Sequence, residues 1–199
     1  MRTWLRRNWW GLAALPVTLA LAVVANSQRI QDYWWDTDLR TAGASGQQGD
    51  WVTWSDSFTD ALGEGVRTFS VRVTAVETTD TEPVVLPADV TAVRVTMDFS
   101  AASDQVLFAC KLALLDADGN RYTYRPLVGG VMQSLFPCLP EQTGPQPSIT
   151  AGEPRVALFG DQRPPEWTTE PVLMVPRGTE LTKVLLWWEE PDYLEVQLT

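Results

Sequence analysis

Hydrophobic and polar residues alternate with a period of two in several segments after residue 51. In residues 66–77, VRTFSVRVTAVE, the side chains of Phe69, Val71, Val73 and Ala75 fall on one face, and the positions between them are mostly polar. The same alternation groups Val93, Val95, Met97 and Phe99, and it also groups Leu194, Val196 and Leu198. This pattern is typical of half-buried antiparallel strands. We expect further short strands near residues 51–55, 155–160, 171–176 and 181–188.

A hairpin is predicted where DADGN, residues 116–120, separates two strand-like runs. The first run places Val106, Phe108, Cys110, Leu112 and Leu114 on one face, and RYTY follows the turn. Several oxygen ligands in DADGN also suggest a calcium site, but the spacing departs from the twelve-residue calcium loop. A turn with Gly119 at positive φ accounts for the same residues.

The segment 134–154 carries five prolines and two glycines. Proline cannot donate to a strand ladder, so we expect a long ordered loop or an insertion here and no sheet strand. About eight strands separated by turn signals predict a two-sheet sandwich. We therefore assign residues 51–199 to one all-β, immunoglobulin-like antiparallel sandwich domain, preceded by an N-terminal transmembrane helix.

An apolar run without charges, WWGLAALPVTLALAVVA, covers residues 9–25. Its length lies at the low end for a membrane-spanning helix and is slightly long for a signal-peptide core. Val23-Val24-Ala25 before Asn26 also resembles a signal-peptide cleavage site. Both a retained anchor and a cleaved signal therefore remain open on this evidence.

The spacing of aromatic residues favours retention of the anchor. Arg6 and Arg7 precede Trp9 and Trp10, and a second group follows at Tyr33, Trp34 and Trp35. In a helix these two clusters would lie roughly 35–39 Å apart, which suits aromatic belts at both interfaces of a bilayer. We predict a cytoplasmic stub at 1–8, a transmembrane helix at 9–35 and a flexible, Gly/Ser-rich tether at 36–50. The arginines place the N-terminus inside and the C-terminal domain outside the cell membrane.

Charge and composition exclude several classes of function. From residue 31 onward the chain carries 11 basic and 25 acidic residues, a net charge of −14, which disfavours nucleic-acid binding. The chain contains no histidine, which excludes Ser-His-Asp and Cys-His catalysis and every metal site that needs imidazole. We expect no enzyme activity, no cofactor and no bound metal.

The two cysteines, Cys110 and Cys138, both follow the apolar run. An extracytoplasmic compartment and an even number permit a disulfide. Closing a loop of about 29 residues would stabilise the fold by roughly 3–4 kcal/mol. Two separate buried thiols are the alternative.

Tryptophans are the candidate interaction residues: Trp51, Trp54, Trp167, Trp187 and Trp188. Adjacent residues of a strand face opposite sides, so at least one of the last pair lies off the core face or under a covering loop. An aromatic patch could bind glycan or a partner protein, whereas core packing is the alternative explanation.

The N-terminal apolar segment, the Gly/Ser tether, the strand–DxDG–strand hairpin and the late segment PVLMVPRGTELTKVLLW resemble a known family. They are similar to the telokin-like, immunoglobulin-like extracellular domains of Gram-positive, including actinobacterial, membrane and surface proteins. This resemblance implies a β-sandwich with a binding or accessory role and transfers no catalytic residues.

The leading hypothesis is a non-catalytic, single-pass membrane protein that serves as an accessory or interaction subunit of a cell-envelope complex, such as a transporter or export system. Its expected partner is another membrane or envelope protein. The alternative is a secreted or surface-exposed module that binds glycan or another ligand after cleavage near Ala25.

Overall fold

The computed structural model describes residues 2–31, 37–60, 63–80, 86–140, 144–150, 153–158 and 162–199. The chain forms two compact units, residues 1–39 and 40–199. The predicted aromatic belt at Tyr33, Trp34 and Trp35 lies outside the described residues.

The first unit consists of helix α1 (Arg2–Ala25) and the short helix α2 (Ser27–Ile30). The part from Arg6 to Ala25 is long and apolar enough to cross a membrane, and it lies near the N-terminus, where a signal sequence meets the same criterion. Helix α1 starts inside the segment predicted as a stub at 1–8, because nothing in MRTWLRRN breaks a helix.

Polar side chains within these helices bond back to the helix backbone. Asn8 Nδ2 donates to the Trp4 carbonyl, and Asn26 Nδ2 donates to the Ala22 carbonyl. Thr18 Oγ1 donates to the carbonyls of Ala14 and Leu15, the two residues that directly precede Pro16 in the helix. Polar groups satisfied in this way are compatible with an apolar surrounding.

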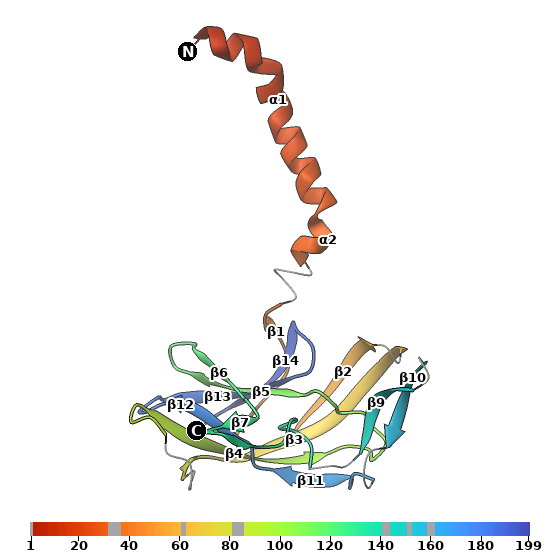
Figure 1. The fold of residues 1–199 in the computed structure, drawn as a ribbon, viewed down its shortest axis with the longest axis vertical. Coiled ribbons are helices and arrows are strands. Elements are labelled where there is room, and N and C mark those ends of the chain that lie inside the picture. The colour runs from red at the N-terminus through yellow and green to blue at the C-terminus, as the bar shows by residue number, and fades with distance from the viewer. Residues whose placement is uncertain are drawn as a thin grey trace. The chain divides into compact units, whose positions relative to one another are not determined.

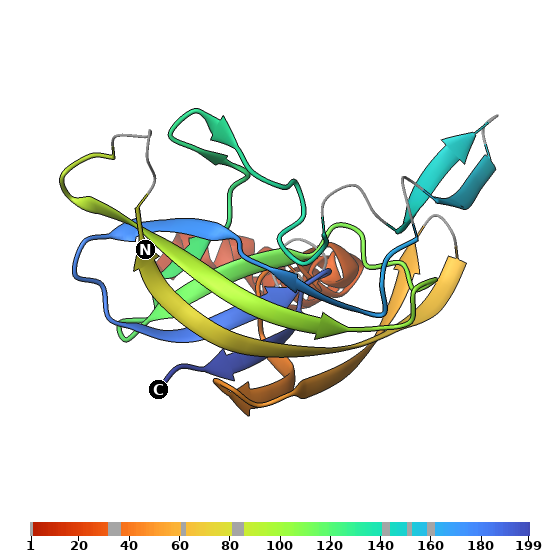
Figure 2. The ribbon, with the colours of Figure 1, turned by 90° about the horizontal axis from the view of Figure 1, so that it is seen from below.

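The second unit is an all-β sandwich of two large sheets (Figures 1 and 2). Sheet A has the strand order β1 (Thr41–Gln47), β14 (Asp192–Gln197), β13 (Leu181–Trp187), β5 (Lys111–Asp116) and β6 (Arg121–Thr123). Sheet B has the order β11 (Glu166–Thr169), β4 (Val90–Ser100), β3 (Gly63–Thr79) and β2 (Val52–Asp60), and β12 (Val172–Pro176) also pairs with β4. Neighbouring strands of both sheets are antiparallel except β1 and β14, which are parallel.

The predicted alternation of buried and exposed positions is confirmed. Phe69, Val71 and Val73 of β3 are buried, and so are Val95, Met97 and Phe99 of β4. Ala75 departs from the pattern because the β3–β4 register shifts between Val73 and Ala75. The core lies between the two sheets. Strands β5, β13 and β14 of sheet A contribute Leu112, Leu114, Val184, Leu186, Leu194 and Val196 to this core.

The predicted strand 106–114 is shorter than expected. Strand β5 begins at Lys111, and Val106 and Phe108 precede it in a segment that turns at Phe108 and Ala109. Ala109 has a φ of 64°, a left-handed conformation that interrupts an extended run.

The prediction of a flexible tether at 36–50 is wrong for residues 41–47, which form strand β1 on the edge of sheet A. The glycines of this segment allow its backbone to pack closely against side chains of β2. A Cβ added at Gly43 would lie 2.6 Å from Trp54 Nε1, and one added at Gly46 would collide with the Val52 side chain. The sandwich therefore begins at Arg40 and not at Trp51.

The Pro-rich segment 134–154 also differs from the prediction. Strands β9 (Pro145–Thr150) and β10 (Glu153–Leu158) pair with each other in a separate two-stranded hairpin. A second small hairpin joins β7 (Leu127–Val128) to β8 (Val131–Met132). Proline is tolerated in β9 because a two-stranded ribbon has outer edges that need no ladder hydrogen bond.

A buried ion pair lies among the aromatic side chains of the core. Arg67 Nη1 donates to Asp56 Oδ2 at 2.8 Å, and both residues are buried on the cross-strand pair of β3 and β2. The Arg67 guanidinium stacks on the rings of Phe58 and Trp188. Burial raises the pKa of Asp56, and Arg67 opposes this effect by favouring the charged carboxylate. Each charged group of this ion pair therefore needs the other to be stable in the buried site.

We predict that Asp56→Ala lowers the free energy of unfolding by about 3–5 kcal/mol, because it leaves a buried guanidinium without its carboxylate. The double variant Asp56→Leu/Arg67→Met, which removes both charges, should recover most of this loss. Urea unfolding of the full chain in detergent, followed by tryptophan fluorescence, measures both changes. Equal stability of Asp56→Ala and the wild type would contradict the prediction.

Candidate functional site

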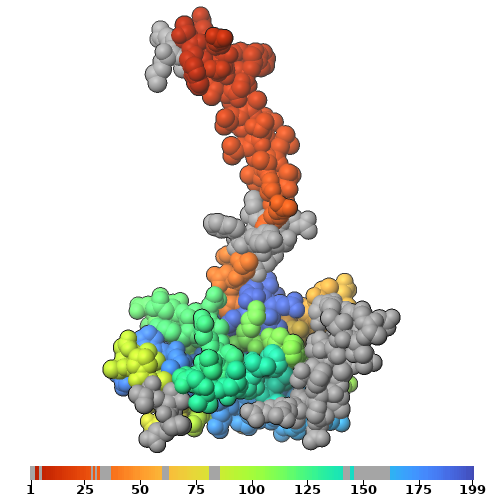
Figure 3. Space-filling view, in the orientation of Figure 1, coloured from red at the N-terminus to blue at the C-terminus, as the bar shows by residue number. Residues whose placement is uncertain are grey.

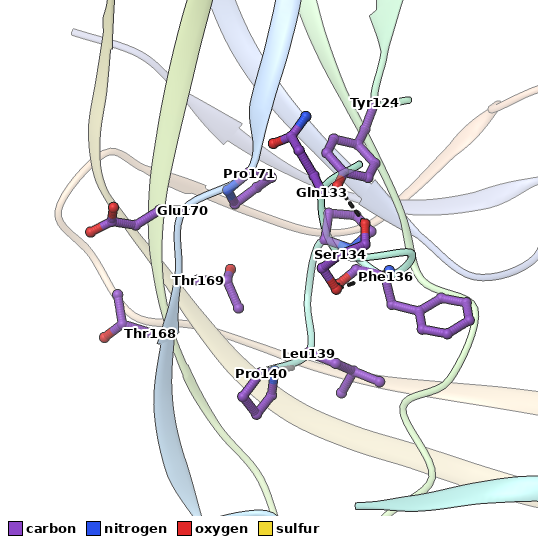
Figure 4. Close-up of a pocket in the computed structure, with 11 residues that line it drawn as sticks. Tyr124, Gln133, Ser134, Phe136, Leu139, Pro140, Thr168, Thr169, Glu170 and Pro171 are labelled. Carbon is purple, nitrogen blue, oxygen red and sulfur yellow. Dashed lines mark hydrogen bonds between the residues drawn. The ribbon is translucent and has the colours of Figure 1, made fainter. Parts of the chain in front are cut away.

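A cavity of about 340 Å³ lies beside strand β11, and we name it the edge groove (Figure 4). One wall is the β11–β12 junction, with Thr168, Thr169, Glu170 and Pro171. The other wall is Tyr124 together with the segment 133–140, from which Gln133, Ser134, Phe136, Pro137, Leu139 and Pro140 line the cavity. Its volume is in the range of small ligand pockets.

The register of β11 decides which of its backbone groups face the groove. Strands β11 and β12 share one register on β4, and the Pro171 carbonyl accepts from Val95 N while the Pro165 carbonyl accepts from Ala101 N. In an antiparallel ladder every second residue bonds to the partner strand. Thr169 therefore bonds to β4, whereas the backbone N–H and C=O groups of Thr168 and Glu170 point away from it.

Side-chain directions support this reading of the edge. Figure 4 shows the side chain of Thr169 pointing from β11 toward Leu139 and Pro140, whereas those of Thr168 and Glu170 point the other way. Thr168 and Glu170 also line the cavity, and the register directs their backbone N–H and C=O groups to the unpaired edge of the strand. Among the described residues, no backbone hydrogen bond outside the strand ladders involves Thr168 or Glu170.

The next residue of the same edge row, Val172, is already paired by a side chain. Gln133 Oε1 accepts from Val172 N at 2.9 Å, and Gln133 Nε2 donates to the Val172 carbonyl at 3.0 Å. This side-chain amide makes the same two hydrogen bonds that one residue of an added strand would make. The edge is therefore closed at Val172, and the groove begins at Glu170.

Thr169 carries a polar atom that points into the groove. The residue is 8% exposed, and its Oγ1 finds no hydrogen-bond partner among the described residues. A buried hydroxyl without a partner costs about 1–3 kcal/mol, so this position favours a bound group that could pair with it.

The second wall is held in place by the Cys110–Cys138 disulfide, which confirms the predicted bond. The Cys138 carbonyl accepts from Trp167 Nε1 at 2.8 Å, which ties the loop to the core face of β11. Tyr124 Oη donates to the Ser134 carbonyl, and burial raises the pKa of Tyr124 to about 12. This hydroxyl therefore stays protonated and keeps its hydrogen bond throughout the physiological pH range.

A stack of side chains supports β11 from the core. The rings of Trp167 and Phe99 are parallel, with centroids 5.4 Å apart, and the guanidinium of Arg163 lies over Trp167. Arg163 is buried and donates to the carbonyls of Gln105 and Ala102. Burial lowers the pKa of Arg163. These contacts fix the inner face of β11 and leave its edge groups exposed to the groove.

Exposed apolar side chains lie next to the groove along the chain. They belong to the β7–β8 hairpin and the residues after it: Leu127, Val131, Met132 and Leu135, each at least half exposed. Leu127 and Met132 are cross-strand partners. In Figure 3 the green and teal surface of this part of the chain fills the middle of the visible face of the sandwich. Apolar residues gathered on a surface often mark interaction sites.

The five candidate tryptophans do not form an exposed patch. Trp54, Trp167, Trp187 and Trp188 are buried, so the aromatic-patch prediction is wrong for these four. Trp54 and Trp188 pack with Phe69 in the core. Trp187 lies on the opposite face of sheet A, as the strand alternation predicts, and its Nε1 donates to Glu190.

Trp51 is the exception, with 47% of its surface exposed. It lies against the Arg72 guanidinium on the outer face of sheet B, and both residues line a cavity of about 260 Å³. Arg72 and Thr168 both donate to Asp98, and the hydrogen bond from Arg72 lowers the pKa of that carboxyl. This face is polar and offers one aromatic ring.

The DADGN segment forms the predicted turn, with Gly119 at a φ of 85°. The carboxylate of Asp116 accepts hydrogen bonds from the backbone and side chain of Asn120 and from the Tyr122 hydroxyl. The side-chain hydrogen bond from Asn120 is the main cause that lowers the pKa of Asp116. Among the described residues, no group of three or more carboxylates or cysteines is placed to hold a metal ion.

Four of the residues predicted to lie at a membrane interface, Arg6, Arg7, Trp9 and Trp10, are on α1 with exposed side chains. The two tryptophan rings contact each other, with centroids 4.3 Å apart. These residues lie at the N-terminal end of the apolar part of the helix, and their place at a membrane interface stays a prediction.

The groove residues on β11 and the side chain of Gln133 were not candidates in the sequence. One signal was present, because proline within a strand pattern indicates an edge strand and Pro171 follows directly after WTTE. The pairing of Gln133 with Val172 spans 39 residues and leaves no local pattern.

Comparisons with known proteins add little to this description. No family model matches the chain, and no curated protein matches it. Among solved structures, the chain is similar to MPT63, a secreted protein from Mycobacterium tuberculosis, with 14% sequence identity and a TM-score of 0.40. The match covers 78% of this chain and 99% of MPT63. The resemblance to telokin-like domains is not established by these comparisons, and the fold assignment rests on the strand order.

We predict that Cys110→Ser/Cys138→Ser lowers the free energy of unfolding by about 3–4 kcal/mol, because the bond closes a long loop of sequence separation 28. Limited proteolysis should then cut within residues 133–140 faster than in the wild type, since this segment loses its covalent attachment. Wild type reduced with dithiothreitol is the matched control and should behave as the double variant. Unchanged stability and unchanged cleavage would contradict the prediction.

Proposed function

We propose that this chain is a non-catalytic, single-pass membrane protein whose β-sandwich lies on the extracytoplasmic side. In this proposal the sandwich acts as an accessory or interaction subunit of a cell-envelope membrane complex, such as a transporter or export system. The edge groove and the apolar hairpin beside it form the contact surface.

The observation that carries the proposal is the exposure of α1. None of the residues in its apolar part is buried. The exposed apolar side chains include Leu12, Leu15, Val17, Leu19, Leu21, Val23 and Val24. A helix that is apolar on all sides needs a lipid or protein surrounding. Arg6 and Arg7 at its N-terminal end favour an orientation with that end in the cytoplasm.

The disulfide supports an extracytoplasmic sandwich, because such bonds persist in oxidising compartments. The acidic balance of the residues after 31 supports a domain that stands away from anionic headgroups. The proposed interaction role draws on the edge groove and on Leu127, Val131, Met132 and Leu135.

The proposal is tested by the intact mass of the protein isolated from host membranes after a carbonate wash. We expect the full-length mass in the membrane fraction, together with a co-purified membrane protein. The matched variant is Ala25→Leu, which blocks a signal-peptidase site because that enzyme requires a small residue there. A retained anchor predicts full-length chains for both proteins, with masses that differ only by the substitution itself.

A soluble wild type that begins at Asn26, with a longer Ala25→Leu variant, would contradict membrane retention. The chain would then be a secreted module. Trp51 and the polar face around Arg72 and Asp98 would become the first surface to test for glycan binding, because an exposed ring can stack on a sugar.

A further inference from the structure

We propose that the edge groove binds an extended segment of a partner protein, which adds as a strand to the edge of β11. This inference deepens the interaction role proposed above and rests on it for the identity of the partner as an envelope protein. The binding mode itself follows from the geometry of Thr168, Thr169, Glu170 and Gln133.

The backbone of β11 selects an extended chain as the occupant. Thr168 and Glu170 together present two N–H donors and two C=O acceptors to the groove, with the two-residue spacing of a strand edge. Gln133 supplies the next rung of the ladder at Val172. A segment in line with that amide would complete the row, which is the pairing used in β-strand addition.

The charged side chains on the solvent-exposed face of β11 indicate which charge the bound segment should carry. The side chains of Glu166, Thr168 and Glu170 share this exposed face. Arg94 Nε lies 3.9 Å from Glu170 Oε2, and a contact this long between two solvent-exposed side chains contributes little to stability. Cross-strand pairs of opposite charge stabilise a sheet. Outward-facing residues of the added segment should therefore be lysine or arginine.

The inner face selects an apolar side chain with one hydrogen-bonding group. Inward-facing residues of the added segment would enter the cavity between Thr169 and the loop that carries Pro137, Leu139 and Pro140. The prolines and leucine offer apolar contact, and Thr169 Oγ1 offers the hydrogen bond that it lacks in the described structure. The expected ligand thus alternates basic and apolar residues.

The experiment pans a phage library of random twelve-residue peptides against the full-length protein in detergent micelles. We expect enriched peptides to alternate basic and apolar residues. Fluorescence anisotropy with the labelled synthetic peptides then gives a Kd for the wild type and for each variant. Methylating every second backbone nitrogen of a peptide should abolish binding for one of the two alternating sets and not for the other, because only one edge of the peptide faces β11.

Two substitutions at one position separate backbone from side chain. Thr168→Pro removes the N–H that faces the groove and should weaken binding about fivefold. Thr168→Val keeps that N–H and removes only the hydroxyl that donates to Asp98, so its Kd should stay within about twofold of the wild type. If Thr168→Pro does not fold, the two methylated peptide sets test the same hydrogen bonds.

Two further variants test the faces of the groove. Thr169→Val should weaken binding about fivefold while leaving the melting temperature of the unbound protein unchanged or higher, because it removes a buried hydroxyl without a partner. Glu170→Lys should weaken binding of basic peptides about fivefold. A general loss of folding would lower the melting temperature in both variants and would not discriminate between peptides.

The proposal is overturned if panning enriches no peptide, or if the enriched peptides bind equally well to Thr168→Pro and Thr168→Val. It is also overturned if the occupant is a second copy of this chain, which would appear as a dimer that Thr168→Pro dissociates. These results do not depend on whether the N-terminal helix is retained. Failure of membrane anchoring and failure of strand addition are therefore distinguishable.

Discussion

The covalent bond between Cys110 and Cys138 fixes the segment on which the open edge of the sandwich depends. It holds the loop at Cys138, whose carbonyl receives the Trp167 indole N–H, while Gln133 pairs with the backbone of β12 a few residues earlier. Between these two attachments the loop stands off from β11 and leaves the edge groove.

An unpaired strand edge can pair with another chain and cause aggregation, and the strand edges of this domain are protected in different ways. Strand β1 extends sheet A with small residues that fit against Trp54 and Val52. The β12 edge is closed at Val172 by a side-chain amide. At β11 the edge is short and flanked by Glu166 and Glu170, a device that discourages indiscriminate pairing between sheets. A short, acidic and partly covered edge admits a selected segment more readily than a second sheet.

Much of the fold could be predicted from the sequence because its signals are local. The alternation around Phe69, Val95 and Leu194 predicted core strands, and Gly119 predicted the turn at Asp116. The residues 41–47 could not be recognised as a strand, because small residues chosen for close packing read like those of a flexible linker. Trp167 and Trp188 were candidates for a surface because burial of an indole depends on distant partners, here Cys138 and Leu107. The groove was missed for the same reason, since its walls join residues about 40 positions apart in the chain.

The most direct test of an open β11 edge is amide hydrogen exchange of the unbound full chain, resolved by residue with NMR. The ladder geometry predicts slow exchange at Trp167 and Thr169, whose N–H groups bond to β4, and fast exchange at Thr168 and Glu170, whose N–H groups face the groove. Equal protection of all four amides would contradict the account, because it would mean that another part of the chain already occupies the edge.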